Sequence, residues 1–471
     1  MSTAKILREL GYNTVSDGFF GYIDVWESWY KGSVDKFHSY EIYNSGDIMK
    51  CHRYSLGMAK KLAEDIANLL MNEKVKITVE GEKEQEFVSR VFAANNFEVK
   101  INEMQEKKAA TGTAAYIPRV IGATVAESGK ILKPADGIAI DYVTAKHIYP
   151  LSWANGIITE CAFDSLRTID GEKYLYLQIH KKAEDGTYDI ENRLYFYDSG
   201  EGLELSEVKG FENMPSVIHT GSDKPQFVID RLNIANNIDE SVPLGIAVYA
   251  NAIDILKGVD IAYDSYVNEF VLGKKRIMVK PGAAVFENGT PVFDANDLTF
   301  YVLPEDMGDG DFIKEIDMTL RTAEHNTGIQ DQLNLLSSKC GFGENHYRFD
   351  SGSISTATQI ISENSTLFRT IRKHEIILND ILTELCRIIL RLGNSSMAMS
   401  LDEDVEISID FDDSIIEDKQ SDFNRDLQLL SAGILNDYEF RAKWLNEDIE
   451  TAKAALPGAE ALTDEPQYEI E

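Results

Sequence analysis

The 471-residue sequence has few cysteines, and their spacing argues against two classes of protein. It contains only Cys51, Cys161, Cys340 and Cys386, and no two of them form a CxxC pair. A disulfide scaffold or a zinc ribbon needs more cysteines or closer pairs. No apolar run is long enough for a membrane-spanning helix, and the first residues lack the apolar core of a signal peptide. We therefore expect a soluble protein that is made inside the cell.

Positive charge is also scarce. Lys and Arg total 46 against 79 Asp and Glu, which gives a formal net charge of −33. About half of this excess falls in residues 401–471, whose end we expect to be a solvated acidic tail. So acidic a surface repels a phosphate backbone, which argues against a conventional DNA- or RNA-binding protein. It leaves open a protein that handles nucleic acid without gripping it.

Recognisable catalytic motifs are missing as well. The sequence has no Walker A loop, no Rossmann glycine fingerprint, no HExxH and no GxSxG. Cys340 and His346 are a weak candidate for a thiol–imidazole pair, which is recognised by geometry rather than by spacing. Asp410, Asp412 and Asp413 suit a divalent cation, but a solvated strand end explains them more simply. We expect no enzyme, no cofactor and no metal.

Apolar periodicity predicts an α+β fold. Helical spacing recurs over residues 21–31, 56–70, 84–96 and 101–111, whereas short alternating runs between 114 and 197 predict a mostly antiparallel sheet. No internal repeat is apparent.

Two unusually long helices are predicted in the second half. The first spans 244–272, after Pro243 and before Gly273, and apolar residues cover most of its circumference. Such a helix must be covered on several sides, either by a large domain or by copies of itself. The second spans 356–392, with a capping box at its start and Gly393 as its stop.

The segment between these helices has its own signals. Lys274, Lys275, Arg276 and Lys280 form a basic cluster. A β-prone region follows, with a hairpin signal at Asn288-Gly289, and then a shorter helix over 320–338. Residues 341–355 are a Gly/Ser-rich loop between strong helices, which we expect to project from a rigid frame.

Several segments in collinear order carry a family resemblance over nearly the whole chain. They are WESWYKG (26–32), SLGMAKKLAEDIANLLMNEKVKI (55–77), IYPLSWANGIITECAF (148–163), PLGIAVYANAIDILKGVDIAYDSYVNEFVLGKKRI (243–277), TATQIISENSTLFRTIRKHE (356–375) and DFDDSIIEDK (410–419). Together they resemble the SPP1-like portal proteins of tailed bacteriophages that infect Gram-positive hosts. The resemblance implies a ring, usually of twelve copies, at one capsid vertex, which conducts DNA during packaging and ejection.

The same resemblance implies partners and a location. A portal ring contacts copies of itself, the major capsid and scaffolding proteins, the terminase large subunit, the head–tail adaptor and the double-stranded DNA that passes through it. It belongs to the virion, and to the host cytoplasm during assembly. Because the chain has no nucleotide-binding loop, a separate ATPase must drive translocation. The alternative is a capsid-associated oligomeric adaptor that conducts no DNA.

The resemblance also divides the chain. The implied parts are a wing (1–240), a first stem helix (244–272), a clip (273–312), a second stem helix (315–338), a tunnel loop (341–355), a long tunnel/wing helix with a wing strand (356–418), and a short crown with the acidic tail (419–471).

Within these parts the resemblance and the pattern suggest roles for individual residues. The polar stripe of the first stem helix would line the lumen: Asn251, Asp254, Asp264 and Asn268. Apolar residues of the same helix would pack between subunits: Leu256, Val259, Tyr263 and Phe270. The basic cluster would act at the stem–clip junction. Asn345, His346 and Arg348 would contact DNA weakly from the tunnel loop. The alternative for that loop is a buried connection with Tyr347 and Phe349 in the core.

Overall fold

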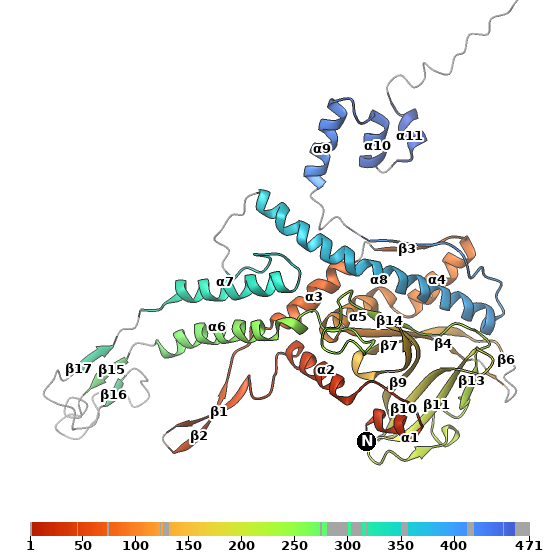
Figure 1. The fold of residues 1–471 in the computed structure, drawn as a ribbon, viewed down its shortest axis with the longest axis horizontal. Helices are drawn as coiled ribbons and strands as arrows, with labels where there is room; N and C mark the ends of the chain where they lie inside the picture. Colours follow the sequence, from red (N-terminus) through yellow and green to blue (C-terminus); the bar gives the residue numbers. More distant parts are fainter. Residues whose placement is uncertain are drawn as a thin grey trace, which may run out of the picture.

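The computed structural model is a body of mixed helix and sheet with two projections, and its C-terminal helices stand apart from the body (Figure 1). The residues it describes are 2–44, 46–72, 75–122, 124–125, 131–273, 276–279, 300–302, 313–316, 319–349, 357–411, 419–445 and 447–456. One projection is the helix pair α6 (Ile253–Leu272) and α7 (Thr322–Lys339), and the other is the hairpin of β1 (Ser39–Asn44) and β2 (Asp47–His52). This mixture of elements confirms the α+β class.

The N-terminal part of the body is mainly helical. Its elements are α1 (Thr3–Glu9), α2 (Asp17–Tyr30), α3 (Met58–Leu70), β3 (Lys76–Val79), α4 (Glu82–Ala94) and α5 (Phe97–Thr111). Helix α3 shows why these segments are helical: Leu62, Ile66 and Leu70 fall on one face and are fully buried. On its other face Lys61 and Asp65 form an ion pair at i, i+4.

The predicted sheet region forms two larger antiparallel sheets and one short antiparallel pair, β5 (Thr124–Val125) with β6 (Ile131–Lys133). The larger has the strand order β12-β11-β10-β9-β8, with β13 also paired to β11, and the smaller has the order β14-β4-β7. The strands are β4 (Thr113–Ile121), β7 (Gly137–Thr144), β8 (Ile148–Ala154), β9 (Ile157–Ile169), β10 (Glu172–Lys182), β11 (Tyr188–Phe196), β12 (Gly202–Leu203), β13 (Val217–His219) and β14 (Val228–Arg231). The Asn155-Gly156 turn between β8 and β9 has positive φ at both residues, as a tight hairpin requires.

Helix α8 (Ala357–Met397) crosses the body, and it is longer than the sequence predicted. Gly393, the expected stop, lies inside the helix. A side chain at this position would collide with Phe87 of α4 and with Leu401. The glycine therefore permits close packing rather than ending the helix. After α8, β18 (Ile407–Asp410) pairs antiparallel with β3, which matches the strand predicted after residue 404.

Helix α6 begins later than predicted. Residues 244–249 are buried but not helical, and a 3₁₀ turn, η3 (Ala250–Ala252), precedes α6. The backbone of this segment bonds to the body instead: the Val248 amide donates to the Ala109 carbonyl (2.9 Å) and the Gly245 amide to Thr113 Oγ1 (2.9 Å). Gly112 and Gly245 approach so closely that neither has room for a Cβ. Tertiary contacts thus override the helical pattern at this end.

Further strands and helices lie at the far end of the α6–α7 pair and at the C-terminus. Three short strands follow α6: β15 (Arg276–Val279), β16 (Phe300–Val302) and β17 (Ile313–Ile316). Strand β15 pairs parallel with β16 and antiparallel with β17. The helix predicted over 320–338 is α7, whereas residues 315–316 belong to β17. The C-terminal helices are α9 (Lys419–Ser431), α10 (Asp437–Leu445) and α11 (Ile449–Ala454).

Candidate functional site

The first half of α6 is held against the body by a buried carboxylate. Asp260 is almost fully buried, and it accepts hydrogen bonds from Ser55 Oγ (3.0 Å) and the Leu56 amide (2.8 Å). His38 Nε2 lies 2.9 Å from the same carboxylate, and because His38 Nδ1 accepts from the Val34 amide, Nε2 is the donor. A buried carboxylate needs this many donors. Asp260 therefore fixes the segment around the β1–β2 hairpin to α6.

The four residues predicted to line the lumen do not share one environment in the structure. Asn251 is exposed and exchanges hydrogen bonds with Asn237, while Asp254 is 93% exposed beside Lys257. Asp264, in contrast, is buried and accepts from the Tyr54 amide (3.0 Å) and from Asn268 Nδ2 (3.1 Å). The chain's own N-terminal segment covers Asp264, so of the four predicted residues only Asn251 and Asp254 are well exposed in the single chain.

The predicted subunit-packing residues are split in the same way. Leu256 and Val259 are fully buried in the main core of their own chain, and Tyr263 is half-buried. Phe270 is exposed, as are Ile261 and Val271, which were not singled out from the sequence. Leu256 and Val259 therefore stabilise the single chain, whereas Phe270 and Val271, at the outer end of α6, are exposed.

A charge cluster joins the end of α6 to the start of α7. The Arg321 guanidinium donates to both carboxylate oxygens of Glu269, at 3.1 and 2.9 Å, and the Arg321 amide donates as well, at 3.2 Å. These hydrogen bonds lower the pKa of Glu269 to about 2. His325 lies 3.4 Å from the same carboxylate. The two helices are thus tied together at their outer ends, next to β15–β17.

The described part of the predicted tunnel loop, residues 341–349, is anchored from both sides. Gln330 of α7 donates through Nε2 to the Tyr347 carbonyl and accepts through Oε1 from the Phe349 amide, both at 2.8 Å. Tyr347 is buried and its hydroxyl donates to Asp65 (2.8 Å), while the Phe349 ring stacks edge-on against Tyr266 of α6. The aromatic residues are packed as the alternative interpretation expected.

The three polar residues predicted for this loop lie on its outer side. His346 and Arg348 are exposed and Asn345 is half-buried, with a positive φ of 61°. Residues 350–355 lie outside the described residues. Gly341, also at positive φ, packs so closely on Thr370 of α8 that a side chain there would displace it. The loop thus presents polar side chains from a firmly packed base.

The other predicted sites are only partly described. Lys274, Lys275 and Lys280 lie outside the described residues, and Arg276 begins β15. Asp412 and Asp413 also lie outside them. Burial raises the pKa of the Cys340 thiol to about 12, which argues against a thiolate paired with His346. Within the described ranges, no cluster of His, Cys, Asp and Glu is suited to hold a metal ion. None of the helices described is long and apolar enough to cross a membrane.

The comparison with protein families decides the identity of the chain. A family model described as phage portal protein, SPP1 Gp6-like, matches residues 16–455. The chain belongs to this phage portal family. The match confirms the resemblance drawn from the sequence, and with it the portal fold class and a portal function in a phage capsid. The family is structural rather than enzymatic.

Two further comparisons add little to what the family match shows about this portal protein. A search of curated proteins finds no significant match. Among solved structures, a chain of the "Neck of native GTA particle computed with C12 symmetry" is similar, with 10% sequence identity and a TM-score of 0.38. The match covers 82% of this chain and 88% of that chain.

Sequence reasoning missed a polar hub at the centre of the portal body. Lys108 and Asp230 form an ion pair (2.9 Å) in which both side chains are almost completely buried. Gln105 and the Tyr116 hydroxyl donate to the other oxygen of Asp230. Desolvation lowers the pKa of Lys108, against the opposing effect of Asp230. The partners are distant in sequence, so no local motif marks them.

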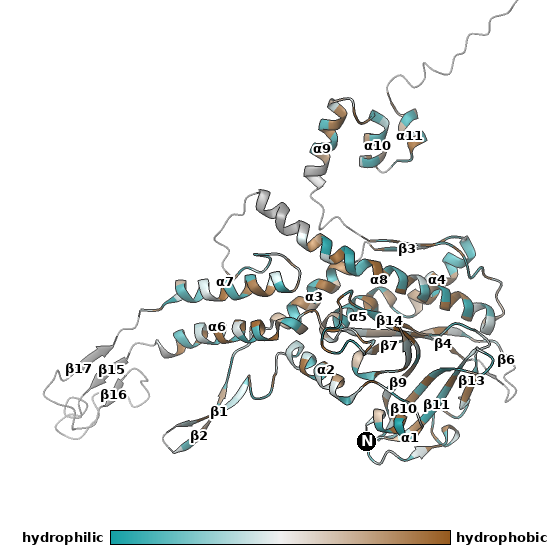
Figure 2. Ribbon diagram, viewed as in Figure 1, coloured by the Kyte–Doolittle hydropathy of each residue, from teal (hydrophilic) through white to brown (hydrophobic). Residues whose placement is uncertain are grey.

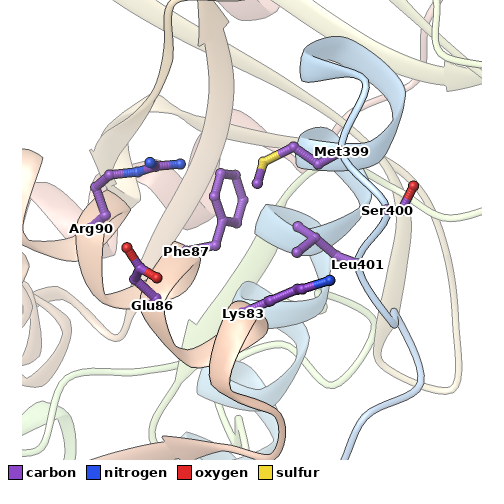
Figure 3. A pocket seen from close by; sticks show the side chains of 7 residues that line it. All are labelled: Lys83, Glu86, Phe87, Arg90, Met399, Ser400 and Leu401. Carbon is purple, nitrogen blue, oxygen red and sulfur yellow. The ribbon is translucent and has the colours of Figure 1, made fainter.

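A shallow groove lies at the end of the body remote from the stem pair, between α4 and the chain after α8 (Figures 1 and 3). Its volume is about 310 Å³, and it is lined by Lys83, Glu86, Phe87, Arg90, Met399, Ser400 and Leu401. Figure 3 shows Phe87, Met399 and Leu401 turned toward one another, with charged side chains around them. Its apolar part belongs to the packing of α4 on α8.

Proposed function

We propose that this portal protein assembles into a closed ring, usually of twelve copies, that conducts double-stranded DNA into and out of the capsid. The observation that carries the proposal, beside the family, is the outer half of α6. There a helix pair leaves the body (Figure 1), is tied at its tip by Glu269 and Arg321, and still exposes Phe270 and Val271. An apolar surface on so exposed a projection favours a neighbour that covers it.

The charge of the chain supports conduction rather than binding. Each phosphate contact adds affinity through counterion release, which would slow the passage of DNA. The net charge of −33 opposes such contacts, and the exposed Asn251 and Asp254 would give a hydrated, weakly interacting wall. A few cations would give transient contacts: Arg348 on the loop, and the basic cluster Lys274, Lys275, Arg276 and Lys280 at the junction of the stem with the clip.

The partners we propose follow from this function. The clip, residues 273–312, would dock the terminase large subunit and later the head–tail adaptor. The wing would meet the major capsid and scaffolding proteins. The family places the protein in the virion, and we propose that its ring assembles earlier, in the host cytoplasm.

The test is electron microscopy of the purified full-length protein, with its mass measured in solution. Rings with an open centre are expected. Closed oligomers without a bore would favour the capsid-associated adaptor instead, and a monomer at every concentration would contradict both.

The cations are tested separately by packaging assays with assembled rings. Lys274→Gln, Lys275→Gln and Arg276→Gln together should lower the yield of packaged DNA while leaving rings intact. For the loop, His346→Gln with Arg348→Gln changes only exposed side chains, so packaging or DNA retention should change without loss of folding. Tyr347→Phe is the matched control, because it removes the bond to Asp65 and leaves the polar surface unchanged. Unchanged packaging in both sets would contradict the proposed DNA contacts.

A further inference from the structure

The β1–β2 hairpin exposes apolar side chains on both of its faces. Cross-strand partners share a face, so Ile42 lies beside Met49 on one face and Tyr43 beside Ile48 on the other. Their exposed fractions are 46%, 50%, 75% and 67%. Among the described residues the sheet consists of these two strands alone, and Figure 1 shows it standing away from the body.

A hairpin of this kind is marginal in water when it stands alone. Two strands bury too little apolar surface for independent stability, and both have an open edge. Large apolar side chains on two opposite faces require a partner that wraps or clasps the tip, since one flat surface would cover only one face. The hairpin therefore has the character of an arm whose tip is completed from outside.

The root of the arm, in contrast, is firmly fixed. Arg53 donates through its amide to the His38 carbonyl (2.8 Å) and through its guanidinium to the Phe37 carbonyl (2.7 Å), and it covers the Phe37 and Tyr40 rings. Just beyond this point, Asp260 of α6 binds both the residue before β1 and those after β2. A braced root holds the tip in a defined direction relative to the stem helix.

The charge of the arm selects among possible partners. Residues 35–53 contain three acidic residues (Asp35, Glu41, Asp47) and three of Lys and Arg (Lys36, Lys50, Arg53), so this segment is neutral in a chain of net charge −33. A neutral arm gains little from a nucleic acid, because such binding depends on excess positive charge. It can approach another copy of an acidic chain without the repulsion that most of the surface would impose.

The same chain also offers a surface that suits the tip. Phe270 and Val271 are exposed at the outer end of α6, and the adjacent Glu269 is neutralised by its ion pair with Arg321. In Figure 1 the hairpin tip stands apart from its own α6. Within one chain the two apolar surfaces do not meet, but a ring joins unlike surfaces of adjacent subunits.

We infer that the β1–β2 hairpin is an assembly arm whose apolar tip docks on a second copy of this chain. The inference rests on the proposed ring and adds the element that holds adjacent subunits together. The stem helix, through Asp260, aims the arm, and the neighbouring subunit covers its tip.

The first experiment replaces the most exposed pair, Tyr43→Ser with Ile48→Ser, and follows assembly by mass photometry. The concentration for half-assembly should rise roughly hundredfold, because each subunit loses two large apolar contacts. The matched control is Glu41→Gln with Lys50→Gln, which changes the same strands and should shift assembly by less than about threefold. Circular dichroism should show both variants folded, since all four side chains are exposed.

A second experiment identifies what covers the tip. A photo-reactive benzoylphenylalanine at position 43 should give cross-linked species of two or more chain masses from intact rings. Cross-links only within one chain, cross-links to a different polypeptide in virions, or none at all would overturn the inference, as would wild-type assembly of the serine variant. If the wild type forms no ring at any concentration, the proposed function fails first, and these outcomes are thus distinguishable.

Discussion

The two halves of α6 face different environments, although one apolar pattern runs through both. In the first half, Leu256, Val259 and Asp260 are buried by the chain itself. At the outer end, Phe270 and Val271 are exposed, and Figure 2 shows polar and apolar residues mixed along this projection. The buried residues of the first half belong to the folding of one subunit. The exposed residues at the outer end are the ones that we propose a neighbouring subunit covers.

The same division runs through the whole molecule. In the body, the Lys108–Asp230 pair and the Asp260 cluster are buried with partners from their own chain. The tip of the β1–β2 hairpin and the outer end of α6, in contrast, expose large apolar side chains away from the body. Substitutions in the body should therefore lower the stability of the single chain, whereas substitutions in the projections should change assembly and leave the chain folded.

The largest effect on stability is expected from Asp230→Ala. The change leaves the Lys108 ammonium buried without its counter-ion, which costs about 3–5 kcal/mol in the free energy of unfolding. Urea denaturation measures it. Lys108→Met combined with Asp230→Ala removes the stranded charge and should recover part of the loss. A single variant as stable as the wild type would show that the body does not depend on its polar hub.

The comparison within α6 is tested directly by Leu256→Ala against Phe270→Ser. Leu256→Ala opens a cavity in the core and should cost about 2–5 kcal/mol in unfolding free energy. Phe270→Ser should cost less, about 0.5–1.5 kcal/mol, because the ring is partly exposed and its intrachain aromatic contact is with Tyr266. It should also raise the concentration needed for assembly. If Phe270→Ser lowers the unfolding free energy of the monomer as much as Leu256→Ala does, the outer end of α6 stabilises the single chain as much as its first half does.

Much of the fold could be predicted from periodicity, and the misses have identifiable causes. Helix α7 and the strand β18 lie where the pattern placed them, because each carries the apolar spacing of the element that it forms. The start of α6 was misplaced because Gly245 meets Gly112, a contact between segments far apart in sequence. Periodicity does not distinguish a carboxylate facing a channel from one bonded to backbone amides, which is why Asp264 was expected in the lumen.

A smaller effect is expected at the base of the tunnel loop. Gln330→Met removes both hydrogen bonds that hold the loop to α7, and losing the bond to the half-buried Phe349 amide costs about 1 kcal/mol. Hydrogen exchange should accelerate at residues 347–349. Asn334→Ala is the control, because it removes a neighbour of Gln330 and leaves both loop bonds in place. Unchanged exchange in Gln330→Met would mean that Tyr347 and Phe349 alone hold the loop.

The smallest effect at neutral pH concerns His180 in the larger sheet. Its ring is fully buried between Phe163 and Phe227, neither nitrogen has a hydrogen-bond partner, and desolvation lowers its pKa to about 3. The unfolded chain therefore binds a proton between about pH 6.5 and pH 3 that the folded chain does not, so stability falls as the pH falls through this window. At pH 5 the loss from this residue is about 2 kcal/mol.

His180→Phe should remove that loss, because the new ring carries no titrating group. Its unfolding free energy should match the wild type closely at pH 7.5 and exceed it by about 2 kcal/mol at pH 5, measured by urea denaturation at each pH. Phe227→Leu disturbs the same packing but keeps the imidazole, so it should retain the wild-type dependence on pH. If the unfolding free energies of the wild type and of His180→Phe depend on pH in the same way, His180 has the same protonation state in the folded and the unfolded chain. In that case the loss of stability at low pH would not come from the buried His180 ring.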